Sequence, residues 1–278
     1  MELLKIAAFS DGERGGNPAG VAIADALPTE AEMQRIAADV GFSETAFAAP
    51  LAGGGWRVRY FSPESEVPFC GHATIALGAA LALRDGDGRF ELTLNQAVIS
   101  VEGRRDAGVI AAALQSPPTR SAAISDALLE ETLALFGYQR GDLDPRIPPA
   151  RIHGGADHLG LVLRSRESLS AMRYELDAGR RLMNREGLVT ILLGWAESPT
   201  RFHTRNPFAS GGVYEDPATG AATAAFAGYL RDIDWPHGGE IEIIQGEDMG
   251  SRSILHARIP DERGSSIRVS GTARVMPD

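Results

Sequence analysis

The chain has 278 residues, of which 44% are hydrophobic and 23% are charged, and its formal net charge is −10. These proportions are those of a globular protein and exclude a chain that is disordered throughout. The negative charge argues against nucleic acid as a partner, because phosphate binding needs clustered lysine and arginine. The length suits one large domain or two of ordinary size.

The sequence also argues against a membrane protein and against a disulfide-bonded one. No run approaches the roughly 18 apolar residues that a membrane-spanning helix needs. The first residues lack the basic region and the apolar core of a secretory signal. The single cysteine, Cys70, allows no internal disulfide. We therefore expect a cytoplasmic protein that makes no contact with a membrane.

Strands and helices are predicted to alternate along the chain. Alternating apolar residues or short apolar runs predict strands at residues 56–60, 90–94, 159–163, 191–195 and 241–244. Helices are predicted at residues 30–40, 73–83, 126–136 and 220–231. The first helix has the clearest boundaries, because Thr29 and Glu32 form a capping box and Gly41 is placed to end it.

Glycine-rich turns interrupt the strands, as at residues 53–55 and 85–88. Such turns favour mixed or antiparallel sheets with hairpins over a doubly wound parallel sheet. Residues 116–119, Ser-Pro-Pro-Thr, are the best candidate for a linker, because proline is excluded from helix interiors and central strands. We therefore predict an N-terminal half, residues 1–116, and a C-terminal half, residues 117–278, whose last strand can pack back on the first half.

Each half contains a helix rich in alanine and glycine that begins at a turn with a glycine. Residues 70–74, Cys-Gly-His-Ala-Thr, open the first of these helices, and residues 218–223, Ala-Thr-Gly-Ala-Ala-Thr, open the second. Small residues on all sides suit a helix wrapped by a sheet, and the free N–H groups of a first turn can bind an anion. The repeat indicates either two similar domains with a cleft between their helix starts or simply two tightly packed helices.

Three ionisable residues stand out as candidates for proton transfer. Glu44 is the one carboxylate in the apolar segment 42–47. If it points inward, burial raises its pKa toward the range of a general acid or base, and if it points outward it is an ordinary surface residue. His72 lies at a helix start, where the dipole favours the neutral imidazole that can exchange protons. Asp216, which follows Glu215, is either a site residue or part of a structural helix cap.

The remaining candidates for metal or cofactor binding are weak. The sequence lacks the usual nucleotide-binding loops and metal-ligand motifs, so we expect no metal and no organic cofactor. His153 and His158 are five positions apart, which is not the spacing of a helical metal-binding pair. We expect both histidines in a surface loop.

Six motifs occur in the same order, and at similar spacing, as in one known family. They are GNPAG at residues 16–20, FSETAF at 42–47, RYFSPESEVPFCGHAT at 59–74, RNPFASGGVYEDPATGAA at 205–222, QGEDMGSRS at 245–253 and IRVSGTARV at 267–275. Together they resemble the phenazine-biosynthesis PhzF-like family, and EDPATG with CGHAT is the specific combination. The resemblance implies the α/β (α+β) fold of diaminopimelate epimerase, with two similar halves that are each a mixed, mostly antiparallel sheet around a central helix.

The resemblance also implies roles for individual residues. Glu44 matches the family's proton-transferring glutamate, and His72 and Asp216 match two further catalytic residues. The substrate-binding positions that it implies are Asn17, Gly71, Ala73, Thr219, Gly220 and Ala221. Ala221 stands where the family commonly has serine, so a hydroxyl that could bind a substrate carboxylate is missing.

The function implied is that of a cofactor-independent isomerase, commonly a homodimer, which moves a proton within a small metabolite that carries a carboxylate. The best-understood members act on a dihydro-hydroxyanthranilate. The alternatives are a non-catalytic metabolite-binding protein of the same fold and an epimerase or racemase. Related epimerases use a cysteine at each helix start, whereas the second helix here offers only Ala221 and Ala222. Because a lone buried thiol is usually inert packing, we expect Cys70 to be structural.

Overall fold

The computed structural model describes residues 1–277, and the chain divides into two compact units. The first unit comprises Met1–Gln115 together with the residues from Ser270 onward, and the second comprises Ser116–Val269. None of the helices within residues 1–277 is long and apolar enough to span a membrane.

The first unit is a mixed sheet packed around helix α2 (Gly71–Asp85). Its other elements are β1 (Glu2–Ala8), β2 (Asn17–Ile23), α1 (Glu30–Val40), β3 (Thr45–Pro50), β4 (Trp56–Phe61), β5 (Glu66–Val67), β6 (Gly88–Thr93), β7 (Val98–Asp106), most of β8 (Val109–Pro118) and the end of β17 (Ser266–Val275). The pairs β2–β3 and β4–β6 are parallel, and the pairs β1–β2, β1–β17, β3–β4, β4–β5, β6–β7 and β7–β8 are antiparallel.

The second unit repeats this plan around helix α6 (Gly220–Asp232). Its strands are β9 (Arg120–Ala123), β10 (Ala150–His153), β11 (Asp157–Leu163), β12 (Thr190–Ala196), β13 (Arg201–Phe208), β14 (Val213–Asp216), β15 (Glu240–Gln245) and β16 (Ser253–Arg258). Its other helices are α3 (Asp126–Phe136), α4 (Arg166–Ser170), α5 (Leu176–Glu186) and the short 3₁₀ turns η1 (Arg140–Asp142), η2 (Ala209–Gly211) and η3 (Glu247–Met249). Here β11–β12 and β13–β15 are parallel, and β9–β10, β10–β11, β12–β13, β13–β14 and β15–β16 are antiparallel.

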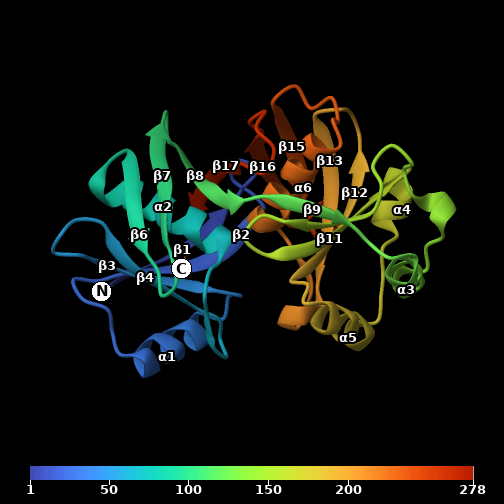
Figure 1. The fold of residues 1–278 in the computed structure, drawn as a ribbon. Coiled ribbons are helices and arrows are strands. Elements are labelled where there is room, and N and C mark those ends of the chain that lie inside the picture. Colours follow the sequence, from blue (N-terminus) through green and yellow to red (C-terminus); the bar gives the residue numbers. More distant parts are fainter. Residues whose placement is uncertain (278) are drawn as a thin grey trace. The chain divides into compact units, whose positions relative to one another are not determined.

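The two central helices are short of large side chains, which lets strands pack on them from several directions (Figure 1). In α2 every residue from His72 to Ala82 is buried, and in α6 every residue from Ala222 to Arg231 is buried. At the helix starts, Gly71 and Ala221 are partly exposed, whereas Gly220 is buried. The starts of both helices therefore lie at the edge of their own units' cores.

The fold class predicted from the sequence is confirmed, and so are the predicted strands and helices. The capping box of α1 is present as predicted, because Thr29 and Glu32 exchange hydrogen bonds, and Gly41 ends that helix in the left-handed conformation with φ 72°. Residues 53–55 turn between the antiparallel strands β3 and β4. Residues 85–88, by contrast, end α2 and lead into β6 rather than forming a hairpin.

Two further local predictions are wrong. Residues 116–118 are not a linker but the last residues of β8, where proline is tolerated because a strand end needs fewer ladder hydrogen bonds. The Ser116 hydroxyl accepts a hydrogen bond of 2.9 Å from the Ile267 N–H and so helps to fix this strand end. His153 and His158 lie in β10 and β11 rather than in a surface loop, and His158 is fully buried with Nδ1 2.8 Å from the Thr190 hydroxyl.

Candidate active site

Glu44 and His72 form a close pair in the first unit. Glu44 immediately precedes β3, and its carbonyl oxygen accepts a hydrogen bond of 3.1 Å from the Gly20 N–H at the neighbouring strand β2. Its side chain is only 12% exposed, and Oε2 lies 3.4 Å from Nε2 of His72. The carboxylate thus points inward, which is the orientation that a general acid or base needs and one of the two that the sequence left open.

Gly20, the last residue of the GNPAG motif, allows this approach of β2 to β3. A Cβ atom at Gly20 would lie 2.6 Å from Oγ1 and 2.9 Å from Cγ2 of Thr45. Real Cβ atoms essentially never come this close to another heavy atom, so a larger residue at Gly20 would displace Thr45 and the strand that begins beside Glu44. Asn17, in the same motif, is the first residue of β2, where it is buried and pairs with Ala8.

His72 is the second residue of α2, and neighbouring side chains contact both of its ring nitrogens. Its Nε2 lies 3.4 Å from the Ser43 hydroxyl, and its Nδ1 lies 3.4 Å from Sγ of Cys70. Glu44, Cys70 and His72 each offer one ligand atom within 4.8 Å of the others. The first unit therefore gathers a carboxylate, a thiol and an imidazole at the start of its central helix.

A buried hydroxyl pair supports this helix start from the core side. The Thr74 hydroxyl donates to the carbonyl oxygen of Cys70 at 2.7 Å, so its oxygen accepts from the Tyr60 hydroxyl, also at 2.7 Å. Burial raises the pKa of the Tyr60 hydroxyl well above its usual range, which keeps its proton available as the donor. The backbone that leads from Cys70 to His72 is thereby anchored to β4.

The second unit places Asp216 beside the start of α6. Asp216 is the last residue of β14 and is buried, and its Oδ2 accepts a hydrogen bond from the Thr219 hydroxyl. Gln245 at the end of β15 ties this turn together. Its Nε2 donates to the Asp216 carbonyl oxygen at 2.6 Å and to the Thr219 hydroxyl at 3.0 Å, and its Oε1 accepts from the Thr219 N–H at 3.0 Å.

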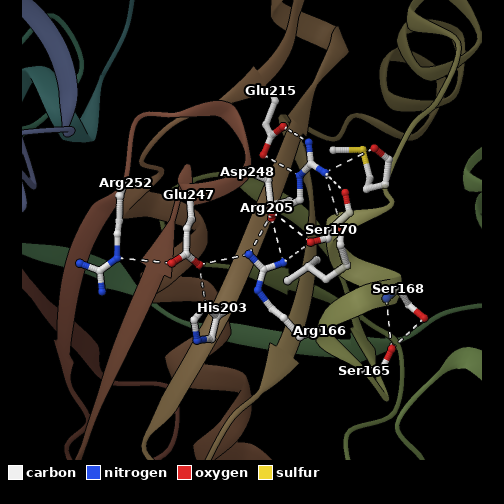
Figure 2. A network of polar contacts seen from close by, with 12 residues as sticks. Ser165, Arg166, Ser168, Ser170, His203, Arg205, Glu215, Glu247, Asp248 and Arg252 are labelled. Carbon is white, nitrogen blue, oxygen red and sulfur yellow. Dashed lines mark hydrogen bonds and ion pairs between the residues drawn. The ribbon is translucent and has the colours of Figure 1, made fainter.

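A buried ion pair fixes the strand that presents Asp216 (Figure 2). Arg205 on β13 reaches Glu215 through two hydrogen bonds, from Nε to Oε1 at 2.9 Å and from Nη2 to Oε2 at 2.5 Å. Its Nη1 also donates to the Ser170 carbonyl oxygen at 2.9 Å. Burial lowers the pKa of the Arg205 guanidinium, but the hydrogen bonds with Glu215 outweigh burial and raise that pKa.

A second charged group in Figure 2 holds the turn η3, which follows Gln245. Arg166 lies 3.1 Å from the Glu247 carboxylate and 3.0 Å from the Asp248 carboxylate, and His203 Nδ1 lies 3.0 Å from Glu247. Burial raises the pKa of both carboxyls. Arg166 outweighs burial at Asp248, and His203 and Arg166 together outweigh it at Glu247, so the pKa of each carboxyl is lowered. These contacts hold in place the segment that follows Gln245.

The starts of α2 and α6 share a feature that sets them apart from the other α-helices. Within residues 1–277, α1, α3, α4 and α5 are capped by the side chains of Thr29, Ser125, Ser165 and Glu175. Among these described residues, no side chain forms a capping hydrogen bond at the start of α2 or of α6. The first N–H groups of a helix have no partner inside the helix, so these two starts are suited to bind an anion.

The structure brings the predicted site residues together in two groups. Glu44 and His72 lie with Gly71 and Ala73 in the first unit, and Asp216 lies with Thr219, Gly220 and Ala221 in the second. Their joint action on one substrate stays a prediction from the sequence. Reasoning from the sequence missed Gln245 and Arg205. Both lie in motifs that carry the family resemblance, but nothing local showed that their side chains would reach the turn around Asp216.

The class of protein follows from the comparison with known sequences and structures. A family model described as "Phenazine biosynthesis-like protein" matches residues 6–277. The chain belongs to this family. It is 33% identical to the trans-2,3-dihydro-3-hydroxyanthranilate isomerase of Pseudomonas fluorescens, over 96% of this chain and 94% of that protein. It is 34% identical to the enzyme of the same name from Pseudomonas aeruginosa, over 98% of this chain and 96% of that protein.

Solved structures agree with this assignment at the level of the fold. The crystal structure of a Bacillus anthracis phenazine biosynthesis protein of the PhzF family matches with a TM-score of 0.85 at 23% identity, covering 100% of this chain and 98% of that one. The protein is therefore an isomerase of the PhzF-like type with a diaminopimelate epimerase-like fold. A non-catalytic binding protein and an epimerase or racemase, the alternatives from the sequence, are not favoured.

Proposed function

We propose that this isomerase moves a proton between two carbon atoms of a small metabolite that carries a carboxylate, with Glu44 as the proton carrier. The observation that supports the proposal most directly is the contact of 3.4 Å between the shielded Glu44 carboxylate and His72 Nε2. A carboxylate next to an imidazole can hold a proton and exchange it, which a purely binding site does not need.

In the proposed mechanism Glu44 takes a proton from an acidic carbon and returns it to another carbon of the same molecule. The electron pair left by the first step moves along the conjugated system of the substrate, so the product is an isomer and no atom is gained or lost. His72 and Asp216 orient polar groups of the substrate. Hydrogen-bond donors aimed at the developing negative charge stabilise the transition state.

The uncapped starts of α2 and α6 support the choice of an anionic substrate. Both have first-turn N–H groups, and each has a partly exposed residue in its first turn, Gly71 in α2 and Ala221 in α6. The positive end of a helix dipole favours a carboxylate by about 0.3–1 kcal/mol, and more where the site is partly buried. We propose that the substrate carboxylate binds at such a helix start.

We propose trans-2,3-dihydro-3-hydroxyanthranilate as the first substrate to test, since two relatives are named for its isomerisation. Turnover in deuterated water is expected to place deuterium in the product wherever the carried proton exchanges with solvent. Glu44→Gln is expected to lower kcat by about 10³-fold or more, because the amide keeps the shape but cannot carry a proton. Glu64→Gln, an exposed change of the same kind, serves as the matched control. Near-normal turnover by Glu44→Gln would remove Glu44 from the mechanism.

We also propose a homodimer located in the cytoplasm. The cytoplasmic location is supported by the single cysteine, which cannot form an internal disulfide. The dimer is carried over from the family resemblance. Light scattering after gel filtration measures the mass directly, and a mass close to the 29.5 kDa of one chain would contradict the dimer.

A further inference from the structure

The cluster of Glu44, Cys70 and His72 has the composition of a transition-metal site. We propose that these three side chains bind one divalent transition-metal ion such as Zn²⁺, and that the bound ion switches the isomerase off. The sequence alone favoured an inert role for Cys70, but its thiol lies beside two potential ligands of other kinds, a carboxylate and an imidazole. Thiolate and imidazole ligands select zinc, cobalt and similar ions over Mg²⁺ and Ca²⁺, which prefer oxygen ligands.

The distances between the ligand atoms suit a tetrahedral ion. Bonds of about 2.0–2.3 Å to zinc give tetrahedron edges of roughly 3.3–3.7 Å. His72 Nε2 lies 3.4 Å from Glu44 Oε2 and 3.9 Å from Cys70 Sγ. The remaining edge, from the thiol to the carboxylate, is at most 4.8 Å, so these two ligands are the pair that must draw closer around a bound ion. Three protein ligands leave a fourth position for water or another small ligand.

The charge of the cluster also favours a divalent ion. A carboxylate and a thiolate together neutralise the two positive charges, and the imidazole binds in its neutral form. The start of α2 opposes a cation, but the helix dipole acts there as only about half an elementary charge. All three side chains are at least mostly shielded from solvent, with Glu44 12% and His72 7% exposed and Cys70 buried. The interaction of the ion with its ligands is therefore weakly screened.

Binding of the ion and proton transfer exclude one another. The Glu44 oxygen that would hold the metal is the atom next to His72, and a carboxylate engaged by a dication is a poor acceptor for a proton. This consequence rests on the proposed function, whereas the metal site itself rests only on the geometry of the cluster. It leaves untouched the expectation that turnover needs no metal.

Cobalt is the sharpest probe because a Co²⁺–thiolate bond gives a charge-transfer absorption in the near ultraviolet. Cys70 is the only cysteine of the chain, so such a band can arise only at this site. Titration of the purified full chain with Co²⁺ is expected to give the band with one equivalent bound, and Zn²⁺ is expected to displace it. Because the thiol must lose its proton, binding should weaken as the pH is lowered.

Variants locate the other two ligands. Cys70→Ser should abolish the charge-transfer band, and Glu44→Gln and His72→Gln should each weaken Co²⁺ binding at least about tenfold. His203→Gln is the matched control, because His203 also lies between carboxylates, 3.0 Å from Glu197 and 3.0 Å from Glu247, but outside the cluster. Unchanged affinity in Cys70→Ser, or Co²⁺ bound without the band, would overturn the site.

A measurement on the unmodified protein keeps the test independent of how the variants fold. Zn²⁺ should slow alkylation of Cys70 by iodoacetamide at least about tenfold, as followed by intact mass, and no protection would count against the site. The activity assay separates this inference from the proposed function. Bound Co²⁺ with full isomerase turnover would leave the metal site intact and remove Glu44 as the proton carrier. Loss of turnover in Glu44→Gln, together with no metal binding by the unmodified protein, would support Glu44 as the proton carrier and overturn the metal site.

Discussion

Arg205 and Glu215 form a buried two-point ion pair, and Glu215 is the residue that immediately precedes Asp216. The guanidinium also reaches the carbonyl oxygen of Ser170, so it links β13, β14 and the end of α4. A backbone tied in this way leaves Asp216 little freedom to move away from Thr219. We infer that the pair positions the site residue beside it rather than contacting a substrate.

Replacing Arg205 tests this role. Arg205→Met leaves the Glu215 carboxylate buried without its partner, which is expected to lower the free energy of unfolding by about 3–5 kcal/mol. Urea denaturation followed by circular dichroism measures the change. Adding Glu215→Gln removes the orphaned charge and should restore part of the loss. Arg166→Met, at a guanidinium that is 23% exposed, should cost less. Equal losses for Arg205 and Arg166 would contradict a special role for the buried pair.

Gly20→Ala is expected to disturb the backbone beside Glu44 and so to lower both stability and kcat. The new methyl group would lie 2.6 Å from Thr45 Oγ1, and overpacking of this kind typically costs about 1–3 kcal/mol. Because the Gly20 N–H also binds the Glu44 carbonyl oxygen, kcat should fall in protein that remains folded. Gly53→Ala is the control, since a Cβ atom there meets nothing within 4 Å.

A second substitution shows whether the clash is the cause. Thr45→Ala removes two of the three atoms nearest to the new methyl group, so it should rescue Gly20→Ala in part. Thr45→Ala alone should cost little in hydrogen bonding, because the buried Thr45 hydroxyl has no hydrogen-bond partner among the described residues. Failure of the double variant to recover turnover would show that Gly20 acts through something other than its contact with Thr45.

The sequence predicts those parts of this molecule whose causes are local. The boundaries of α1 follow from Thr29, Glu32 and Gly41, which act within one or two turns of the helix. The central helices are recognisable because small residues extend over whole helices, and only a surrounding sheet makes such a helix stable. The linker prediction rested on Pro117 and Pro118, because proline is excluded from helix interiors and central strands. It was wrong because proline is tolerated at the end of a strand, which is where both residues lie.

The contacts that assemble the candidate site are not local. Nothing in the segment around Glu44 reveals that its carboxylate meets His72, because the contact depends on how β3 and α2 pack in the folded unit. The cluster with Cys70 depends on the same packing. Gln245 reaches Thr219 from another strand, and its side chain could as well have faced solvent. Only the family resemblance pointed to these segments together, and it named the motifs rather than their contacts.

His158 is expected to make stability depend on pH. Burial lowers the pKa of this imidazole to about 3 in the folded protein, against 6.5 for an ordinary histidine. Between these values the unfolded chain binds a proton that the folded chain does not, so stability falls as the pH drops below about 6.5 and is unaffected by this group above it. The expected loss is on the order of 1 kcal/mol between pH 7.5 and 5.5.

His158→Gln isolates that contribution, since burial also lowers the pKa of His237 and adds a change of the same sign. Urea midpoints of the two proteins at pH 7.5 and 5.5 provide the comparison. The variant should be less stable at pH 7.5, where the hydrogen bond to Thr190 is lost or altered, but should lose less on acidification. An identical pH dependence in both proteins would show that the imidazole is not buried in the neutral form.

Ala221→Ser is expected to tighten the binding of a carboxylate ligand. Ala221 is the second residue of α6, it is partly exposed, and no side chain caps this helix start among residues 1–277. A serine hydroxyl there adds one donor beside N–H groups that already favour an anion, and one net hydrogen bond contributes about 1 kcal/mol. That corresponds to a dissociation constant lower by roughly fivefold. Calorimetric titration with an unreactive carboxylate analogue of the substrate measures the change, and the matching neutral amide serves as the control. The gain should be larger for the carboxylate than for the amide, because a donor at the positive end of a helix interacts more strongly with a full negative charge. Equal gains for both ligands, or none for the carboxylate, would show that the start of α6 does not bind the anionic group.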